Sequence, residues 1–304
     1  MKNDYAEFYG PRYWFIWLGL GFLRLLSFLP LPFLTILGYL FGATAYGLFS
    51  SRRVIALKNL RACFPEKDLA ELKKINFKHF LFIGQAIFTS PINWWINRQR
   101  FERLVSISGR EAYDQALAEK RNIILLAPHF MAMEISGLLL QAERPMIGMY
   151  QYMKNPLLNK IAINQRQRFC EGGVMFERKD SLRSILRELG KGFPMQYSPD
   201  QDAMRKGVFV PFFHTLASTT PALGKFVKAT DAVVIPCYSI YKPWGLGYEV
   251  ILGEALEGLV ADDDIHNATL MNQAIETMIR NHPAQYLWSH KRFKTRPEGE
   301  KPFY

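Results

Sequence analysis

The segment NIILLAPHFMAMEISG, residues 122–137, places a histidine and an acid close together after an apolar run. His129 follows that run directly after a proline, and Glu134 comes five residues later. A neutral imidazole can take a proton from a hydroxyl group. A carboxylate at its second ring nitrogen fixes the tautomer and stabilises the imidazolium that forms. The pair therefore predicts general-base chemistry on a substrate alcohol, with His129 as the base and Glu134 as its partner, and it needs no serine nucleophile.

The expected location of the pair supports this chemistry. Residues 122–127 read as a buried strand and residues 131–141 as the next helix, and α/β sheets bind ligands beyond the carboxyl ends of their strands. On one continuous helix, positions five residues apart would point about 140° apart. We therefore expect a turn at His129 that lets Glu134 reach back to the imidazole. Six histidines and 27 acidic residues make this spacing common by chance, so a pair without a catalytic role is the alternative.

Other kinds of catalytic site lack their motifs. The chain has no GxSxG, no GxxxxGK[ST] and no HExxH, and its other histidines have no ligand spacing. These absences argue against a usual serine hydrolase, a P-loop and a zinc site. Cys63, Cys170 and Cys237 are far apart and odd in number, which argues against a disulfide framework and favours a reducing compartment. We expect no metal and no bound cofactor.

The N-terminal part is apolar. Between residues 13 and 50 the only ionised residue is Arg24. Residues 13–29 and 33–49 each come close to the roughly 20 residues that a spanning helix needs. The region is too long for a secretory signal and shows no clear cleavage site. A basic cluster follows, which predicts a cytoplasmic flank that binds anionic head groups; it comprises Arg52, Arg53, Lys58 and Arg61.

Three interpretations of this part stay open. One is a spanning helix followed by an interfacial helix, the second is a hairpin that dips into the bilayer and returns, and the third is a buried pair of soluble helices. We favour a membrane interpretation, because soluble cores rarely run this long without charge. We therefore predict an N-terminal membrane-embedded helical anchor over residues 1–50 and a catalytic domain over residues 51–304.

Residues 51–304 alternate short apolar runs with amphipathic segments. This pattern predicts a single α/β domain whose central, mostly parallel sheet is flanked by helices. A helix is expected over residues 68–88, with core positions Leu72, Ile75, Phe80 and Ile83. The expected strands are VSIS, NIILLAP, PMIGMY, GVMF, FPMQYS, AVVIPCYSIY and GYEVILGEA. The expected later helices are EAYDQALAE, MAMEISGLLLQ, NPLLNKIAINQRQRF, SLRSILRELG and residues 267–281.

The net charge is +11, from 38 basic and 27 acidic residues. Such an excess favours acidic partners, which include nucleic acid, anionic lipid, phosphorylated substrates and acidic proteins. We expect no nucleic acid, because the basic residues are dispersed and a nucleic-acid binder would leave the apolar N-terminal part unexplained.

Several segments occur in an order and spacing that resemble one protein family. They are PRYWFIWLGLGFLRLLSFLP from residue 11, KNLRACFPE from 58, HF…E from 129, NPLLNKI…RQR from 155, ERKD from 177, SPDQD from 198, GVFVPFF from 207, STT from 218 and HPAQYLWSHKRFKTRPEGE from 282. Together they resemble the late acyltransferases of lipid A biosynthesis, of the lauroyl/myristoyl type, within the lysophospholipid acyltransferase superfamily. The resemblance covers nearly the whole chain.

The resemblance implies an activity and partners. Such enzymes move a fatty acyl chain from acyl carrier protein to a hydroxyl of a lipid A precursor, at the cytoplasmic side of the inner membrane. The expected partners are thus acyl carrier protein, lipid A precursor and inner-membrane lipids, with acyl carrier protein as a co-substrate. The family's HX4[DE] dyad falls on His129 and Glu134. Arg166, Arg168 and Asp200 are expected in substrate binding, with Asp200 following a predicted strand.

The match has departures and alternatives. SPDQD stands where the glycerolipid branch of the superfamily usually has Pro-Glu-Gly-Thr, which makes a glycerolipid acceptor less favoured. Gln201 stands where the lipid A branch often has histidine. Asp180, preceded by Arg178 and Lys179, is a candidate helix cap, as are the two threonines of STT. Another glycolipid or mannolipid acceptor remains open, and so does a catalytically inactive, membrane-bound lipid-binding protein.

Overall fold

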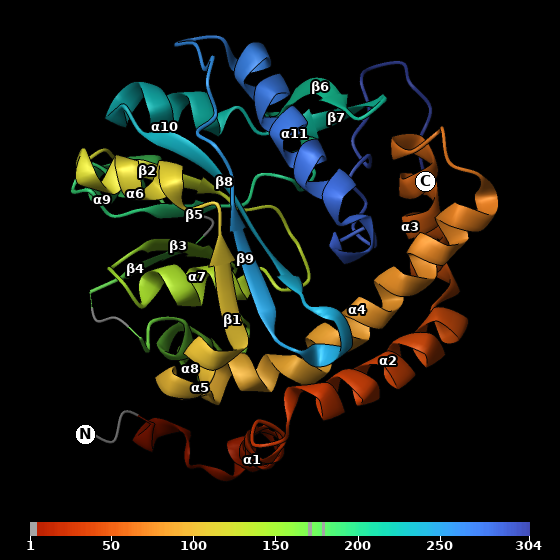
Figure 1. Ribbon diagram of the computed structural model, residues 1–304, viewed down its shortest axis with the longest axis vertical. Coiled ribbons are helices and arrows are strands. Elements are labelled where there is room, and N and C mark those ends of the chain that lie inside the picture. Colours follow the sequence, from red (N-terminus) through yellow and green to blue (C-terminus); the bar gives the residue numbers. More distant parts are fainter. Residues whose placement is uncertain (1–4, 170–171, 178–179) are drawn as a thin grey trace.

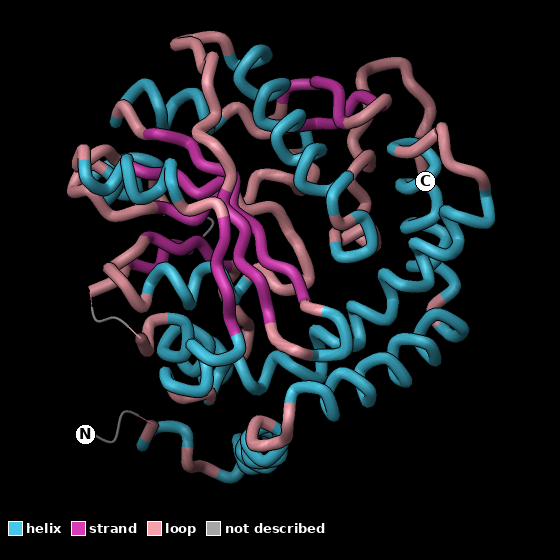
Figure 2. Tube along the Cα trace, in the orientation of Figure 1, coloured by secondary structure: helices cyan, strands magenta, loops and turns pink. Residues whose placement is uncertain are grey.

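A computed structural model describes residues 5–169, 172–177 and 180–304. A sheet runs through the middle of the molecule with helices on both faces, and long N-terminal helices form a curved arc along one edge (Figures 1 and 2). Cys63 and Cys237 are free and buried, whereas Cys170 lies outside the described residues, as do Arg178 and Lys179. The predicted α/β class is confirmed.

The central sheet has seven strands in the order β1-β9-β8-β2-β5-β3-β4. Strands β8, β2, β5, β3 and β4 are parallel, β9 is antiparallel to β8, and β1 is parallel to β9. The strands are β1 (Val105–Ser108), β2 (Ile123–Leu126), β3 (Ile147–Tyr150), β4 (Val174–Glu177), β5 (Met195–Tyr197), β8 (Val233–Tyr241) and β9 (Tyr248–Leu252). Each coincides with a segment that the sequence predicted as a strand, and only β4 extends beyond it, by one residue, to Glu177. β2 is buried throughout because it is covered on both faces, and its uninterrupted IILL reflects this.

Helices cover both faces of the sheet. The helices are α1 (Trp14–Leu26), α2 (Leu31–Leu48), α3 (Ser50–Cys63), α4 (Leu69–Trp95), α5 (Arg98–Leu104), α6 (Glu111–Ala118), α7 (Glu134–Gln141), α8 (Pro156–Arg166), α9 (Leu182–Leu189), α10 (Ala222–Thr230) and α11 (Asp264–Asn281). The core on one face joins the sheet to α5, α6 and α7, and the core on the other face joins it to α9, α10 and α11.

The predicted helix at residues 68–88 is α4, which extends further, to Trp95. The Asp68 side chain caps its start by accepting from the backbone N–H of Glu71. Of the predicted core positions, Leu72 and Phe80 are buried, while the other two are half-buried. The separate antiparallel hairpin of β6 (Val208–Phe212) and β7 (Thr215–Thr219) was not predicted from the sequence, and the helix expected after the STT segment, α10, was predicted without bounds.

In the N-terminal part, α2 lies along α4 (Figure 1). Gly38 and Gly42 of α2 face Gly84 of α4 so closely that a Cβ on any of them would overlap backbone atoms of the other helix. Small residues spaced in this way let two helix backbones approach. By length and composition, α2 is the one helix among the described residues that could cross a membrane, and part of its surface is buried within the protein.

Candidate active site

The site is built at the carboxyl ends of β2 and β5. These strands are parallel neighbours, with Leu126 opposite Tyr197. His129 follows the first strand and Asp200 follows the second, so the register brings two residues that are 71 positions apart to the same edge. This is the edge where α/β sheets place their ligands.

Asp200 holds His129 with both carboxylate oxygens. Its Oδ2 accepts from the His129 backbone N–H at 2.9 Å, and its Oδ1 lies 2.7 Å from the ring Nδ1. Because a carboxylate only accepts, Nδ1 carries the hydrogen, and Nε2 keeps the lone pair that a general base needs. The predicted partner was wrong: Asp200 takes the place on the imidazole that the sequence analysis assigned to Glu134.

The pair shifts both pKa values. Burial would lower the pKa of His129, but the charge and hydrogen bond of Asp200 raise it above its ordinary value. Burial would likewise raise the pKa of Asp200, yet His129, through its charge and its ring and backbone hydrogen bonds, lowers it to about 2. The carboxylate therefore stays ionised and favours an imidazolium at His129, which is what a base requires after it has taken a proton.

Glu134 has a different partner. The helix expected from residue 131 begins only at Glu134, and the preceding residues form a turn. From that position the Glu134 carboxylate accepts a hydrogen bond of 2.5 Å from Arg166 at the end of α8. The two side chains are each 35% exposed. Of the five predicted site residues, His129, Glu134 and Arg166 line one cavity. A fourth, Asp200, lies behind the histidine and holds it.

That cavity has a volume of about 880 Å³. It extends into a gap in the sheet, because β5 and β3 pair only at Met195 and Ile147 and separate beyond that point. Its apolar lining includes side chains from both faces of the sheet, namely Met133, Leu138, Met146, Met175, Ile185 and Phe226. A cavity of this size with a largely apolar lining, next to a histidine base, suits a substrate with a hydrocarbon chain.

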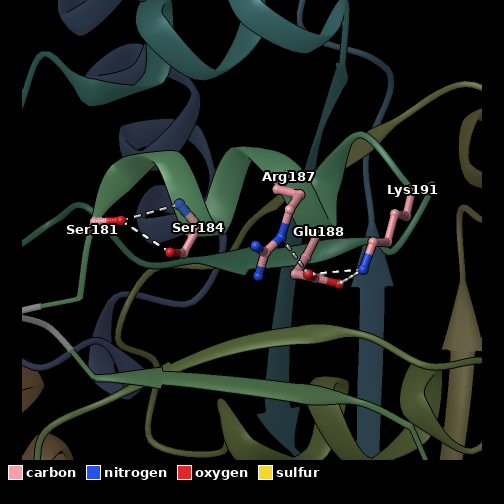
Figure 3. A network of polar contacts seen from close by, with 5 residues as sticks. All are labelled: Ser181, Ser184, Arg187, Glu188 and Lys191. Carbon is pink, nitrogen blue, oxygen red and sulfur yellow. Dashed lines mark hydrogen bonds and ion pairs between the residues drawn. The ribbon is translucent and has the colours of Figure 1, made fainter.

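One wall of the cavity is helix α9, which contributes Leu182 and Ile185. Figure 3 shows how this helix is fixed at both ends. The Ser181 hydroxyl accepts from the backbone N–H of Ser184 at 3.2 Å and caps the start, so the predicted cap at Asp180 was wrong by one residue. At the other end, hydrogen bonds from Lys191 and Arg187 lower the pKa of the Glu188 carboxyl group. The network holds the two apolar side chains in place.

The C-terminal segment contacts strand β7 and the turn that carries His129. Arg292 is buried and donates to the Ser218 carbonyl at 2.6 Å and to the Thr219 hydroxyl at 2.7 Å. The backbone N–H of Leu287 donates to the His129 carbonyl at 3.0 Å. Thr219 is therefore a partner of Arg292 and does not cap α10, whereas the Thr220 hydroxyl accepts weakly from Ala222. The sequence analysis gave Arg292 no role, since nothing in its local sequence distinguishes a buried arginine from an exposed one.

Gln201 lies on the other side of the imidazole. Its side-chain Nε2 is 3.3 Å from the His129 Nε2, and the Gln201 carbonyl accepts from Arg292 at 3.4 Å. An amide N–H can donate to the lone pair of a neutral imidazole. The resting base is thus covered by a polar group that a substrate hydroxyl would have to displace.

Arg168 is placed apart from these residues. It lies beyond the end of α8, and it is not among the side chains that line the cavity. Its Nη1 donates to the Gln165 carbonyl at 3.0 Å, and its guanidinium lies 4.3 Å from the centre of the Phe169 ring. Burial lowers its pKa to about 10. Its predicted substrate contact stays a prediction.

The chain is similar to known proteins over nearly its whole length. The profile of a family described as bacterial lipid A biosynthesis acyltransferase matches residues 1–295. The lipid A biosynthesis lauroyltransferase of Escherichia coli (strain K12) is 35% identical over 291 residues, covering 95% of this chain and 94% of the relative. The palmitoleoyltransferase of the same organism is 33% identical over 301 residues, covering 98% and 97%, and its myristoyltransferase is 30% identical over 296 residues, covering 97% and 91%. The chain therefore belongs to the bacterial lipid A biosynthesis acyltransferase family.

Proposed function

We propose that this acyltransferase moves a fatty acyl chain from acyl carrier protein to a hydroxyl group of a lipid A precursor. The observation that carries the proposal is a histidine base that is held by a buried carboxylate and lines a largely apolar cavity. Family membership supplies the reaction class and the lipid A pathway. The acyl donor and the roles of the individual residues are part of the proposal.

The proposed mechanism starts at the free ring nitrogen of His129. Asp200 keeps the hydrogen on Nδ1, so Nε2 takes the proton of the acceptor hydroxyl as its oxygen attacks the thioester carbonyl carbon. The tetrahedral oxyanion then collapses, the new C–O ester bond is complete, and the C–S bond breaks. The imidazolium returns its proton to the departing thiolate and leaves a free thiol on the carrier.

Glu134 and Arg166 are proposed to act as a unit in this reaction. Their ion pair faces the cavity, and a guanidinium suits phosphate or a developing oxyanion. Glu134 would orient the guanidinium, and substrate would compete for its charge. Glu134 thereby keeps a role in catalysis that does not depend on touching the imidazole.

The apolar part of the cavity is proposed to hold the donor's hydrocarbon chain. It runs along β3, where Gly148 has no side chain and Met175 of the neighbouring strand β4 lies opposite it in register. A Cβ at Gly148 would lie 2.6 Å from the Met175 sulfur atom, so the Met175 side chain occupies the space above Gly148 in this part of the cavity wall. The acceptor would approach from the polar end, where Arg166 lies.

The proposed partners and location follow from charge and family. Acyl carrier protein is acidic and lipid A precursors carry phosphates, so a chain with net charge +11 favours both encounters. The apolar N-terminal part supports a place at a membrane, proposed here as the cytoplasmic side of the inner membrane.

The experiment that tests the function uses detergent-purified protein, a panel of acyl-carrier thioesters and lipid A intermediates, with products identified by mass spectrometry. We expect an acylated lipid A product and loss of that product in His129→Ala and Glu134→Ala, while both variants stay folded by circular dichroism. Transfer only to another glycolipid would change the acceptor. Binding without release of carrier thiol would identify an inactive lipid-binding protein. Full activity in either folded variant would refute the mechanism.

A further inference from the structure

The connection between β8 and β9 exposes two large apolar side chains. This short segment contains a 3-10 turn at Pro243–Gly245. Trp244 is 76% exposed and Leu246 is 68% exposed, although the glycines beside them, Gly245 and Gly247, are buried. Neither residue belongs to the apolar N-terminal part, and no sequence pattern singled them out.

The backbone of Trp244 is strained. Its φ is 58° and its ψ is 17°, a left-handed conformation that bulky residues rarely adopt. Glycine at this position would carry no such penalty. A strained residue that exposes an indole ring to water points to a function for the exposed ring.

The same connection is attached to the start of α2. The position of a Cβ on Gly245 would overlap the Thr35 hydroxyl and approach the Pro32 backbone within 2.9 Å, so the loop lies directly against α2. Thr35 in turn accepts a hydrogen bond of 2.9 Å from Gln85 of α4. Loop, α2 and α4 therefore form one packed unit, and the tip of the β8–β9 hairpin lies at these helices in Figure 1.

Exposed apolar side chains also cover α1, its C-terminal turn and α2. They are Trp14, Phe15, Leu18, Phe22, Leu25, Phe28, Phe33, Ile36, Leu40, Phe41 and Leu48. The only ionised residue among these helices, Arg24, donates to the Trp95 carbonyl and lies over the Phe28 ring. A surface this apolar and this free of charge is rare on a soluble protein and marks an interaction site.

The helices are arranged to lie along a membrane. With 13 residues, α1 is about 20 Å long and too short for a hydrocarbon layer of about 30 Å. α2 is fixed to α4 through the glycine contacts, and α4 is fixed to the sheet by a 3.0 Å hydrogen bond between Thr89 and Tyr241. If α2 crossed a bilayer it would draw α4 in with it, including the exposed Lys78.

We propose that α1, α2 and the β8–β9 connection form one membrane-binding surface that lies in the plane of a single leaflet, with Trp244 and Leu246 inserted at the interface. The occupant is a lipid bilayer, because tryptophan favours the interface and because α1 and α2 expose apolar side chains on one side while they pack against α4 on the other. The inference rests on the proposed location at a membrane and adds the mode of binding and a second contact outside residues 1–50.

This orientation has a consequence for the site. α1 packs against α8 through Leu20, Leu157 and Ile161. The last residue of α8 is Arg166, which lines the cavity. A lipid in the leaflet beside α1 would therefore be one helix away from the proposed site.

The test compares binding of the full chain to vesicles of phosphatidylethanolamine and phosphatidylglycerol after removal of detergent. The variant Trp244→Ala/Leu246→Ala is compared with Val260→Ala/Ile265→Ala, which removes two exposed apolar side chains near the start of α11, far from α2 in Figure 1. We expect partitioning of the first variant to weaken about tenfold or more, since full burial of one large apolar side chain is worth about that factor. Partitioning of the control variant should change by less than about twofold, because its two side chains stay in water whether or not the protein is bound.

A second variant separates membrane binding from a structural role. Trp244→Gly should unfold at a higher urea concentration than the wild type, because glycine relieves the strain, and yet bind vesicles more weakly. Subtracting the fluorescence of Trp244→Phe from that of the wild type gives the contribution of Trp244. Brominated lipids should quench this contribution. Loss of stability in Trp244→Gly together with unchanged binding would overturn the proposal.

A third measurement tests the in-plane arrangement. A cysteine placed at Phe28→Cys, at the turn between α1 and α2, should not react with an impermeant thiol reagent on the opposite side of a sealed vesicle. Reaction there would show that the hairpin crosses the bilayer and would overturn the in-plane arrangement. If the wild type failed to bind vesicles, the proposed membrane location would fall as well. If the wild type and the Trp244→Ala/Leu246→Ala variant bound vesicles equally well, this inference would be refuted while the proposed membrane location would stand.

Discussion

Replacing Asp200 with asparagine should remove the base function of His129 while leaving the cavity intact. Two donors of His129, its backbone N–H and its Nδ1–H, converge on the two oxygens of this one carboxylate. An asparagine side chain offers one oxygen and one NH2 group. Whichever way the amide turns, one donor loses its acceptor or the imidazole adopts the other tautomer, with the hydrogen on Nε2 and no lone pair for the substrate.

The structure sets the size of the effects that Asp200→Asn should have on stability and on rate. The pKa of Asp200 falls from 3.8 to about 2, which at about 1.4 kcal/mol per pKa unit corresponds to about 2.5 kcal/mol of stabilisation of the ionised form. That contribution is complete above about pH 4 and is lost as the pH falls toward 2, so Asp200→Asn should flatten the acid limb of the stability curve there. Loss of a correctly poised general base should reduce the rate roughly 10²- to 10⁴-fold.

The assay follows thiol release and acylated product as a function of pH. In the wild type the rate should rise as the imidazolium loses its proton, and Asp200 places that rise above the ordinary pKa of 6.5. In Asp200→Asn the rise should move to lower pH, because burial continues to lower the pKa of His129 and the carboxylate no longer opposes it.

The matched control for this prediction is Asp202→Asn. Asp202 lies in the same loop and lines the same cavity, but its carboxylate accepts from Thr295 and not from His129. The control should keep the wild-type pH profile. A wild-type rate in Asp200→Asn, together with a pH–rate profile that rises at the wild-type pH, would refute the assignment of Asp200 as the residue that orients the base.

Three further predictions concern the cavity and the helices beside it. Arg166→Ala should reduce kcat/KM strongly but cost less than about 1 kcal/mol in unfolding free energy, because its ion pair with Glu134 is partly exposed; an unchanged kcat/KM would contradict a substrate contact. Gln201→Ala should speed hydrolysis of the acyl thioester in the absence of acceptor by about fivefold, the factor for one neutral hydrogen bond, as water gains access to the free imidazole nitrogen; free-thiol release measures this, and no increase would count against the covering role. Gly84→Ala should lower the unfolding free energy, measured by urea titration, by about 3 kcal/mol, because its Cβ would overlap the α2 backbone. The control Gly47→Ala has open space around it and should stabilise the protein by up to about 1 kcal/mol. Equal effects of the two substitutions would disprove the close helix contact.

The sequence was informative wherever the relevant pattern is local. The apolar run before His129 predicted a buried strand and placed the histidine at its carboxyl end, and β2 confirms this. The alternation of apolar and amphipathic segments likewise predicted the α/β class and most strands. It did not reveal the β6–β7 hairpin, since a proline and three phenylalanines in VFVPFF obscure the alternation of a strand.

The sequence also showed a long, nearly uncharged N-terminal part, because a run of apolar residues can be read without knowing the fold. Only the tertiary structure decided which carboxylate meets the imidazole. Glu134 is near His129 in sequence, but the helix starts at that residue and aims it at Arg166, whereas Asp200 arrives from 71 residues away because β5 pairs with β2. Strand order depends on how all the segments pack at once, and no short stretch of sequence carries that information. The same holds for Trp244, whose exposure follows from the close packing of its loop against α2 and not from its residue type.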